Sequence, residues 1–404
     1  MSDLTVAALA AGFVLLIGGG ESLVRGAGRL AAIIGISPLV VGLTVVAFAT
    51  SAPELAVSAD AALSGHPGLA VGNVVGSNIA NILLILGLTA MVAPLVAKSR
   101  IVRIDIPIMV GFSLVLLVVA LDGTIGFLDG LLLFAGLVTY VVVTVVVSRR
   151  HNAERRAVAA SRAPDGGDGD GDGDDGGGVD EGRKRPPGPG GSHPVLASVG
   201  LVALGIVMLV VGARLLVTAA SDLAAAWGMS DLVIGLTVVA IGTSLPELAT
   251  SLVAAVRGER DLAIGNIVGS NMFNIGAVLG LTALITPIQV APGAIRFDLP
   301  IMLAVSLALL PIAFTGMAIT RWEGLLFSGF YAAYIVYLVL QAADHDALDP
   351  FSTAMLWFVV PITALWLIVL ATYELGVRRG HRQAREKPVA ADDGPPGART
   401  GGPG

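Results

Sequence analysis

The chain has 404 residues, of which 55% are hydrophobic and only 13% are charged, and its mean hydropathy is +0.85. Soluble globular domains are nearer 25% charged, so this composition excludes an ordinary water-soluble enzyme. The net charge of −6 averages an acidic, glycine-rich central stretch with basic segments that flank apolar runs. Cysteine is absent, which excludes disulfide bonds and thiolate metal sites.

Long apolar runs predict an all-α polytopic membrane protein, because about 20 apolar residues cross a hydrocarbon core of ~30 Å. The first run has no basic residues before it, so we expect a retained helix rather than a signal peptide. Eleven spans are predicted, near residues 4–20, 36–60, 68–93, 104–121, 124–148, 194–219, 229–255, 262–286, 298–316, 322–341 and 353–376.

Two polar stretches are predicted to be disordered, because they cannot bury enough apolar surface to offset the entropy of ordering. The first is a linker over residues 151–193 that contains the run DGGDGDGDGDDGGG, and the second is the tail over residues 377–404. An EF-hand reading of the linker from Asp170 fails at its sixth position, which is Asp175 instead of glycine. We therefore interpret the linker as a solvated tether.

Lys and Arg predict the orientation, because basic residues accumulate in cytoplasmic loops. With the N-terminus outside, 22 of the 24 basic residues fall in inner segments, and only Arg214 and Arg296 do not. The C-terminus is then cytoplasmic. Arginine outnumbers lysine 21 to 3, which favours a GC-rich prokaryote as the source. We expect the protein in the cell membrane of such a prokaryote.

The sequence contains an internal repeat. Residues 39–90 align with residues 232–283 at a constant offset of 193, and 33 of the 52 positions are identical. Each copy belongs to a unit of five predicted spans, residues 1–150 and 194–341. An odd number of spans in each unit inverts one copy relative to the other, which is the plan of many secondary transporters.

The repeats place Glu54 and Glu247 inside apolar spans, in the motifs TSAPE and TSLPE. A carboxylate at bilayer depth is costly and normally faces a partner or an aqueous cavity. Neither span offers a basic residue within two turns, so protons or bound cations must balance the charge. Ion binding is favoured over two protonated carboxyl groups that only hold helices together.

Pro53 and Pro246 precede these glutamates and predict helix breaks, because proline donates no backbone hydrogen bond. The breaks free carbonyls in the segments 47–50 and 240–243, where they can face a cation. A plain proline kink is the alternative. A Thr-Ser pair and a carboxylate at each break favour a cation-binding site over a simple kink.

The following spans open with GNVVGSNIAN and GNIVGSNMFN. Ser77 and Asn81 are four residues apart, as are Ser270 and Asn274, so each pair shares one helical face. Carboxylate, hydroxyl, amide and carbonyl oxygens without sulfur or imidazole suit hard ions such as Ca²⁺ and Na⁺. Two carboxylates would balance one Ca²⁺ or at least two Na⁺.

These paired motifs resemble the alpha repeats of the cation/Ca²⁺ exchanger superfamily, specifically prokaryotic Na⁺/Ca²⁺ exchangers. The layout resembles that family over residues 1–341 apart from the linker. The resemblance implies ten helices in two inverted halves and four central ion sites. It also implies alternating access, in which the first and sixth spans slide over the remaining core.

The resemblance also implies ligands. Glu54 and Glu247 would bind Ca²⁺ at the centre, assisted by backbone oxygens of Thr50 and Thr243. The flanking Na⁺ sites would use Ser51, Ser244, Ser77, Ser270 and the carbonyls of Ala47 and Ala240, and Asn81 and Asn274 would border the centre. Some family members carry an acid where this chain has Asn274, which argues against K⁺ co-transport. The eleventh span departs from the ten-helix plan.

We therefore predict a secondary Na⁺/Ca²⁺ antiporter that exports Ca²⁺, with the two ions and the lipid bilayer as partners. The sequence predicts no enzyme, no cofactor, no nucleic acid and no phosphate-binding loop for ATP. H⁺/Ca²⁺ exchange is the alternative within transport, since buried glutamates also bind protons. A cation channel and a membrane scaffold are alternatives outside exchange. Gly18–Gly20 and Gly212 are predicted sliding surfaces, and Asp105 and Asp298 are predicted helix N-terminal charges.

Overall fold

The computed structural model describes residues 3–161, 193–226, 240–314, 317–343 and 345–366, together with residues 368, 369, 372 and 376. The helices and π-helical turns of the first half are α1(Asp3–Ile34), α2(Pro38–Val41), η1(Gly42–Val46), α3(Ala47–Thr50), α4(Ala52–Leu63), α5(Pro67–Ala80), η2(Asn81–Leu86), α6(Gly87–Val92), η3(Ile101–Asp105), α7(Ile106–Val119) and α8(Phe127–Ser161). Those of the second half are α9(His193–Ala226), α11(Ala240–Thr243), α12(Leu245–Val256), α13(Arg260–Phe273), η5(Asn274–Leu279), α14(Gly280–Ile285), η6(Ala294–Asp298), α15(Leu299–Phe314), α16(Arg321–Ala342), α17(Leu348–Ala354) and η7(Met355–Val359).

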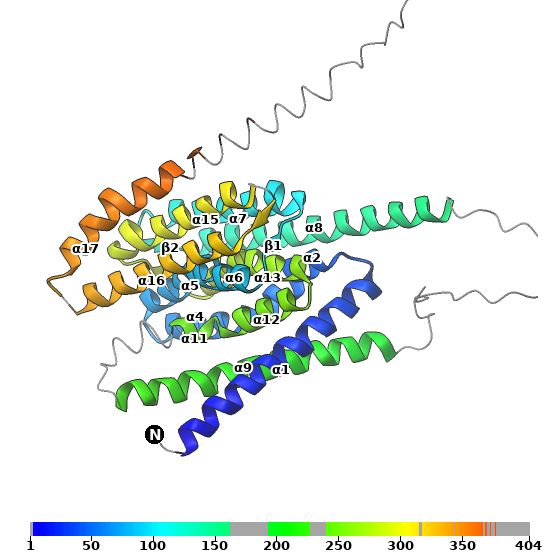
Figure 1. The fold of residues 1–404 in the computed structure, drawn as a ribbon, viewed down its shortest axis with the longest axis horizontal. Helices are drawn as coiled ribbons and strands as arrows, with labels where there is room; N and C mark the ends of the chain where they lie inside the picture. Colours follow the sequence, from blue (N-terminus) through cyan, green and yellow to red (C-terminus); the bar gives the residue numbers. More distant parts are fainter. Residues whose placement is uncertain are drawn as a thin grey trace, which may run out of the picture.

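These elements form the predicted all-α membrane fold (Figure 1). Among the described residues, nine helices are long and apolar enough to cross a bilayer, and a bent pair over residues 38–63 can form a tenth span. The shorter helix α12 is the second half of the predicted span 229–255. The first part of that span, through residue 239, lies outside the described residues.

Contacts between the halves show that they are related by an approximate twofold axis. Strand β1(Leu95–Val96) pairs with β4(Ala318–Ile319), and the equivalent strands β3(Ile288–Gln289) and β2(Thr124–Ile125) pair in the same way. The equivalent hydroxyls of Ser113 and Ser306 are 3.3 Å apart. Both residues therefore lie near the axis.

The first helices of the two halves, α1 and α9, pack against each other in opposite directions on one side of the molecule (Figure 1). A Cβ atom added at Gly19 would lie 2.9 Å from the Gly205 carbonyl oxygen, and one added at Gly212 would lie 2.9 Å from that of Gly12. Small residues allow this close approach. Equivalent helices that run antiparallel are the inversion predicted from the odd span count.

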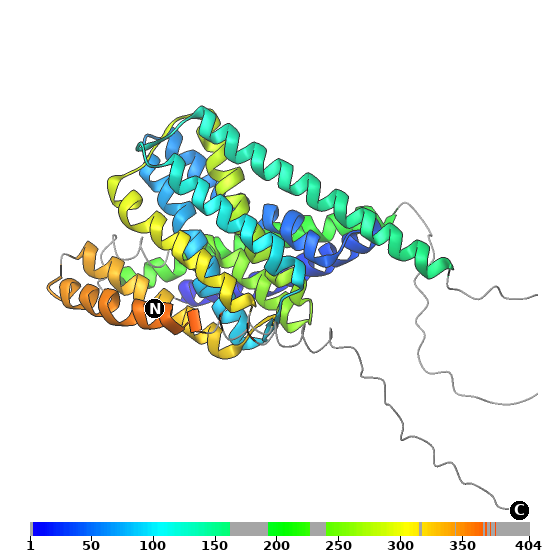
Figure 2. The same ribbon diagram turned by 90° about the horizontal axis from the view of Figure 1, so that it is seen from above.

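Burial separates the centre of the bundle from its periphery. The apolar stretches of the spans Pro67–Val92 and Arg260–Ile285 are 78% and 89% buried, so these two helices form the core. The corresponding value for Leu348–Trp366 is 0%. This last described helix is the predicted extra span, and it lies at the edge beside α16 (Figure 2). The predicted span continued to residue 376, and most residues after 366 lie outside the described part.

Two predicted boundaries are wrong. The first span is predicted to end at residue 20, but α1 continues to Ile34. Within this continuation Glu21 forms an i,i+4 ion pair with Arg25. The linker was expected to begin at residue 151, but α8 continues to Ser161 through an Ala-, Arg- and Glu-rich stretch with high helix propensity. Residues 162–192 of the linker and the tail 377–404 lie outside the described residues.

Asp105 and Asp298 also differ from the prediction. Neither begins a helix, because each ends a π-helical turn that continues directly into the following helix. The Tyr140 hydroxyl donates to Asp105 at 2.9 Å, and the Tyr334 hydroxyl donates to Asp298 at 3.1 Å. These repeat-related bonds tie the fourth and fifth helices of each half together.

The α1–α9 contact generates a prediction for stability. Gly205→Val should lower the free energy of unfolding by about 1–3 kcal/mol, because its side chain would clash with the α1 backbone near Leu23. Gly200→Val is the matched control, since Gly200 lies on the same helix with open space around it. Thermal unfolding followed by size-exclusion fluorescence measures both variants, and equal midpoints would contradict a tight α1–α9 seam.

Candidate cation-binding site

The site begins at two helix breaks. The helix over residues 38–50 is bent by 42° relative to α4. Ser51 between them has φ −82° and ψ 0°, outside the helical region. Ser244 has nearly the same geometry, φ −92° and ψ 7°. The breaks lie where proline was predicted to remove a backbone donor, at Pro53 and Pro246.

Each break leads into a short helix whose first turn carries a glutamate. Glu54 is the third residue of α4 and Glu247 is the third residue of α12, so both carboxylates lie at the positive end of a helix dipole. Both side chains are fully buried. The two carboxylates are close enough for their charges to repel each other. No ion pair within the described residues involves either of them.

Two asparagines, which the sequence analysis did not select, fix the glutamate backbones. The Asn73 side-chain amide donates to the Glu54 carbonyl at 3.4 Å and to the Ser58 hydroxyl at 3.0 Å. Asn266 repeats these bonds to Glu247 and Ser251 at 3.5 and 3.0 Å. Both asparagines stand in the GN pair of each repeat motif, and this duplication is the sequence signal that identifies them.

The two repeats also contact each other across the site. The Thr50 hydroxyl lies 3.2 Å from Asn266 Oδ1 and 3.3 Å from the Ser270 hydroxyl. Helix α4 packs on η5, and α12 packs on η2, so each broken helix faces the straight helix of the other repeat.

Asn81 and Asn274 are the first residues of the π-helical turns η2 and η5. Such turns are frequent at functional sites. The Asn274 amide donates to Asn78 Oδ1 at 3.1 Å, whereas neither polar atom of the Asn81 side chain has a partner in the described chain. The two halves thus present different amide groups to the centre.

The central side chains share an excess of unpaired oxygens. Within the described residues, buried oxygens without a hydrogen-bond partner include both carboxylate oxygens of Glu54 and Glu247, the hydroxyls of Ser51, Ser77 and Ser244, and the side-chain oxygens of Asn81 and Asn274. A buried polar atom that stays unpaired costs roughly 1–3 kcal/mol, and more when it is charged. Hard cations prefer such oxygen ligands. Among the described residues no third acidic or histidine side chain joins the two carboxylates.

The predicted backbone ligands differ between the halves. The Ala47 carbonyl accepts the Ser51 N–H at 3.0 Å and the Thr50 hydroxyl at 3.4 Å. In the second half, the Ser244 N–H bonds to Ile241 instead of Ala240. Thr243 lies at the end of α11 and lines a cavity beside the site.

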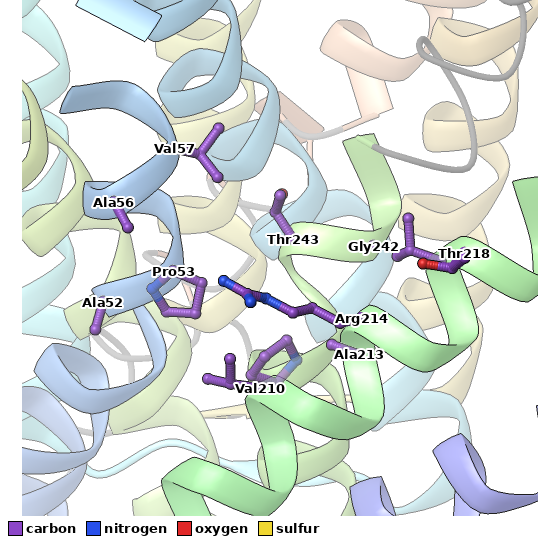
Figure 3. A pocket seen from close by; sticks show the side chains of 12 residues that line it. Ala52, Pro53, Ala56, Val57, Val210, Ala213, Arg214, Thr218, Gly242 and Thr243 are labelled. Carbon is purple, nitrogen blue, oxygen red and sulfur yellow. The ribbon is translucent and has the colours of Figure 1, made fainter. Parts of the chain in front are cut away.

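This cavity has a volume of about 440 Å³ and separates α9 from α4 (Figure 3). Its wall contains Pro53 and Pro246, the neighbours of the two glutamates. The Arg214 side chain extends from α9 toward Pro53, with Thr243 beside it (Figure 3). The cavity therefore borders the residues that immediately precede the two buried glutamates in the sequence.

The equivalent interface in the other half is closed. Helix α1 packs along α12, and a Cβ atom added at Gly20 would lie 3.2 Å from the Ala249 carbonyl oxygen. Glu21 forms an ion pair with Arg257 at the end of α12. One of two symmetry-related routes is therefore open and the other is packed. Of the predicted sliding surfaces, Gly20 faces the core, whereas Gly18 and Gly19 face α9 and Gly212 faces α1.

Comparisons with known proteins decide the family. The family model for the sodium/calcium exchanger protein matches residues 4–146 and 197–340. The chain belongs to the sodium/calcium exchanger family. It is 33% identical to the sodium/calcium exchanger MaX1 of Methanosarcina acetivorans, over 81% of this chain and 96% of MaX1. It is 40% identical to the putative antiporter CaxA of Alkalimonas amylolytica, over 74% of this chain and 86% of CaxA.

A solved structure agrees with this membership. The structure of the sodium-calcium exchanger NCX_Mj matches with a TM-score of 0.67 and 31% identity, over 83% of this chain and 99% of that one. This exchanger is thus a multi-pass cation/Ca²⁺ antiporter, a transporter and not an enzyme. The resemblance drawn from the two repeat motifs is confirmed.

The asparagine contacts generate a prediction for ion affinity. Asn266→Ala removes the bonds to the Glu247 carbonyl, Ser251 and Thr50 together. Loss of groups that orient metal ligands typically weakens binding 10–100-fold, so the Ca²⁺ concentration for half-maximal exchange should rise by about tenfold or more. Asn152→Ala is the matched control, because it removes an amide bond to the Gly35 carbonyl far from the site. An unchanged half-saturation in Asn266→Ala would show that the amide does not position Glu247.

Proposed function

We propose that this exchanger moves Ca²⁺ out of the cell in exchange for Na⁺ by alternating access. The supporting observation is the pair of buried carboxylates, Glu54 and Glu247, with no ion pair in the described chain and surrounded by neutral oxygens. The two negative charges balance one Ca²⁺ or at least two Na⁺. Competition of the two ions for one set of ligands would couple their movements.

The proposed ligand set follows the two repeats. Glu54 and Glu247 hold Ca²⁺, and Thr50 and Thr243 assist through backbone oxygens. The remaining proposed ligands are Ser51, Ser244, Ser77, Ser270, the carbonyls of Ala47 and Ala240, and the bordering amides Asn81 and Asn274. Unpaired buried oxygens on five of these neutral side chains support the assignment.

Alternating access is supported by the unequal packing of two equivalent interfaces. The α9–α4 interface contains the cavity, whereas the α1–α12 interface is packed. Sliding of the α1–α9 pair over the core would close the first and open the second. Because the repeats are inverted, the two routes lead to opposite sides of the membrane.

H⁺/Ca²⁺ exchange is the second candidate, since buried carboxylates without basic partners also bind protons. The neutral hydroxyl and amide oxygens around the glutamates favour Na⁺, which needs several oxygen ligands, over a proton, which needs one. A channel is disfavoured because the carboxylates are fully buried and do not line the cavity beside them.

The first test is uptake of ⁴⁵Ca²⁺ into proteoliposomes preloaded with Na⁺, choline or an acid buffer. We expect uptake only with internal Na⁺, and loss of at least tenfold in Glu54→Gln and Glu247→Gln, because each removes one charge that Ca²⁺ needs. Glu323→Gln is the matched control, since this buried carboxylate already bonds Thr320 in a helix cap that glutamine also forms.

Each other outcome changes the assignment. Uptake driven by the acid interior alone would assign H⁺/Ca²⁺ exchange. Uptake that is equal in all three interiors would indicate a channel. Full activity in both glutamate variants would place the ion site elsewhere.

We propose that the protein lies in the plasma membrane of a prokaryote with the N-terminus outside and the C-terminus in the cytoplasm. The absence of cysteine allows a direct test with single substitutions. Asp122→Cys, in an exposed loop, should react with a membrane-impermeant maleimide in intact cells, whereas Arg150→Cys, near the linker, should react only after permeabilisation. The reverse pattern would overturn this orientation.

A further inference from the structure

Arg214 is a charged residue in a membrane-spanning helix. It lies five residues before the end of the apolar span Val195–Ala219, about 7.5 Å at 1.5 Å per residue. It is one of only two basic residues outside the segments predicted to be cytoplasmic. A charge within an apolar span is costly and normally faces an aqueous cavity or a functional partner. Here it faces the cavity between α9 and α4 (Figure 3).

No acid lines that cavity. Besides Arg214, its wall consists of alanine, valine, proline, glycine and threonine side chains. None of the ion pairs within the described residues includes Arg214. Arg214 also lines a second pocket together with Asp222, farther along α9, but no ion pair joins the two side chains. A cation that moves from the cavity to Glu54 and Glu247 therefore passes a guanidinium group that forms no ion pair in the described chain.

The equivalent position in the other half has the opposite charge. The repeat offset of 193 aligns Arg214 with Glu21, and the flanking residues Gly212 and Leu216 with Gly19 and Leu23. Glu21 lies at the packed α1–α12 interface and pairs with Arg257. The repeat equivalent of Arg257 is Ser64, which has no charge to pair with Arg214.

We infer that Arg214 sets the cation affinity of the exchanger on one side of the membrane only. Its guanidinium lowers the affinity of the site when the cavity beside α9 is open. When the α1–α12 route is open instead, the equivalent position presents the Glu21 carboxylate. This inference rests on the proposed exchange function and deepens it: in the proposed orientation, low affinity at the outer face favours release of Ca²⁺ outside.

The electrostatic origin gives a quantitative signature. Coulomb energy is proportional to the charge of the ion, so Arg214 opposes Ca²⁺ twice as strongly as Na⁺ in free energy. Removing the charge should therefore change the half-saturating Ca²⁺ concentration by the square of the factor for Na⁺. At cavity distances and moderate ionic strength we expect decreases of about tenfold for Ca²⁺ and about threefold for Na⁺.

The experiment compares wild type, Arg214→Gln and Arg214→Lys in right-side-out and inside-out membrane vesicles. Half-saturation by Ca²⁺ and by Na⁺ is measured on each face. Arg214→Gln should show the two decreases only on the face opposite the linker, and Arg214→Lys should behave as wild type because it keeps the charge. Arg296→Gln is the matched control, since it removes an exposed positive charge of η6 that does not line the cavity.

The outcomes distinguish failure of this inference from failure of the proposed exchange function. Four results would each overturn the inference alone. They are normal exchange with unchanged half-saturation in Arg214→Gln, equal changes on both faces, equal factors for the two ions, and the same change in Arg214→Lys. Absence of Ca²⁺ exchange in the wild type would overturn the proposed function as well. Thermal midpoints equal to the wild type establish that both Arg214 variants are folded.

Discussion

The structure depends on two negative charges buried at its centre without a basic partner in the described chain. Glu54 and Glu247 lie between the halves, where water cannot solvate them and where their charges repel. Such a pair is stable only with bound cations or protons. The helix breaks, the N-terminal dipoles and the unpaired oxygens all follow from this requirement, because each brings favourable partial charge or ligand capacity to the same place.

The straight helices explain how such a centre stays ordered. Helices α5 and α13 carry asparagines that hold the backbones of the broken helices, while Thr50 reaches across to Asn266. These bonds fix the positions of the carbonyls and leave the carboxylate oxygens for the ion. Buried polar networks impose a specific geometry where each member has a partner. In this exchanger the unpaired members are those proposed to bind the cargo.

Sequence predicted the features that depend on residue type and local spacing. Pro53 and Pro246 located the breaks, the odd span count gave the inversion, and the two motifs gave the family. Sequence did not select Asn73 or Asn266, because their role depends on contacts with the preceding helix. It ended α1 at residue 20 because it could not show that Glu21 forms ion pairs with Arg25 in the same helix and with Arg257 at the end of α12. It also did not determine which route is open, because both routes are built from similar repeat sequences.

Two identical halves would give a transporter with the same affinity on both faces, so a difference in affinity between the faces must come from the positions where the repeats differ. Several differences lie around the site: Asn274 bonds to Asn78 while Asn81 has no partner in the described chain, and the Ser51 and Ser244 N–H groups use different acceptors. The reversal of charge between Glu21 and Arg214 is the largest of them electrostatically, because a full charge acts over a longer distance than a hydrogen bond. Ion ligands are shared by both states, so they cannot distinguish the two faces. Residues on the α1–α9 pair can distinguish the two faces, because each of these residues borders only one of the two routes to the site.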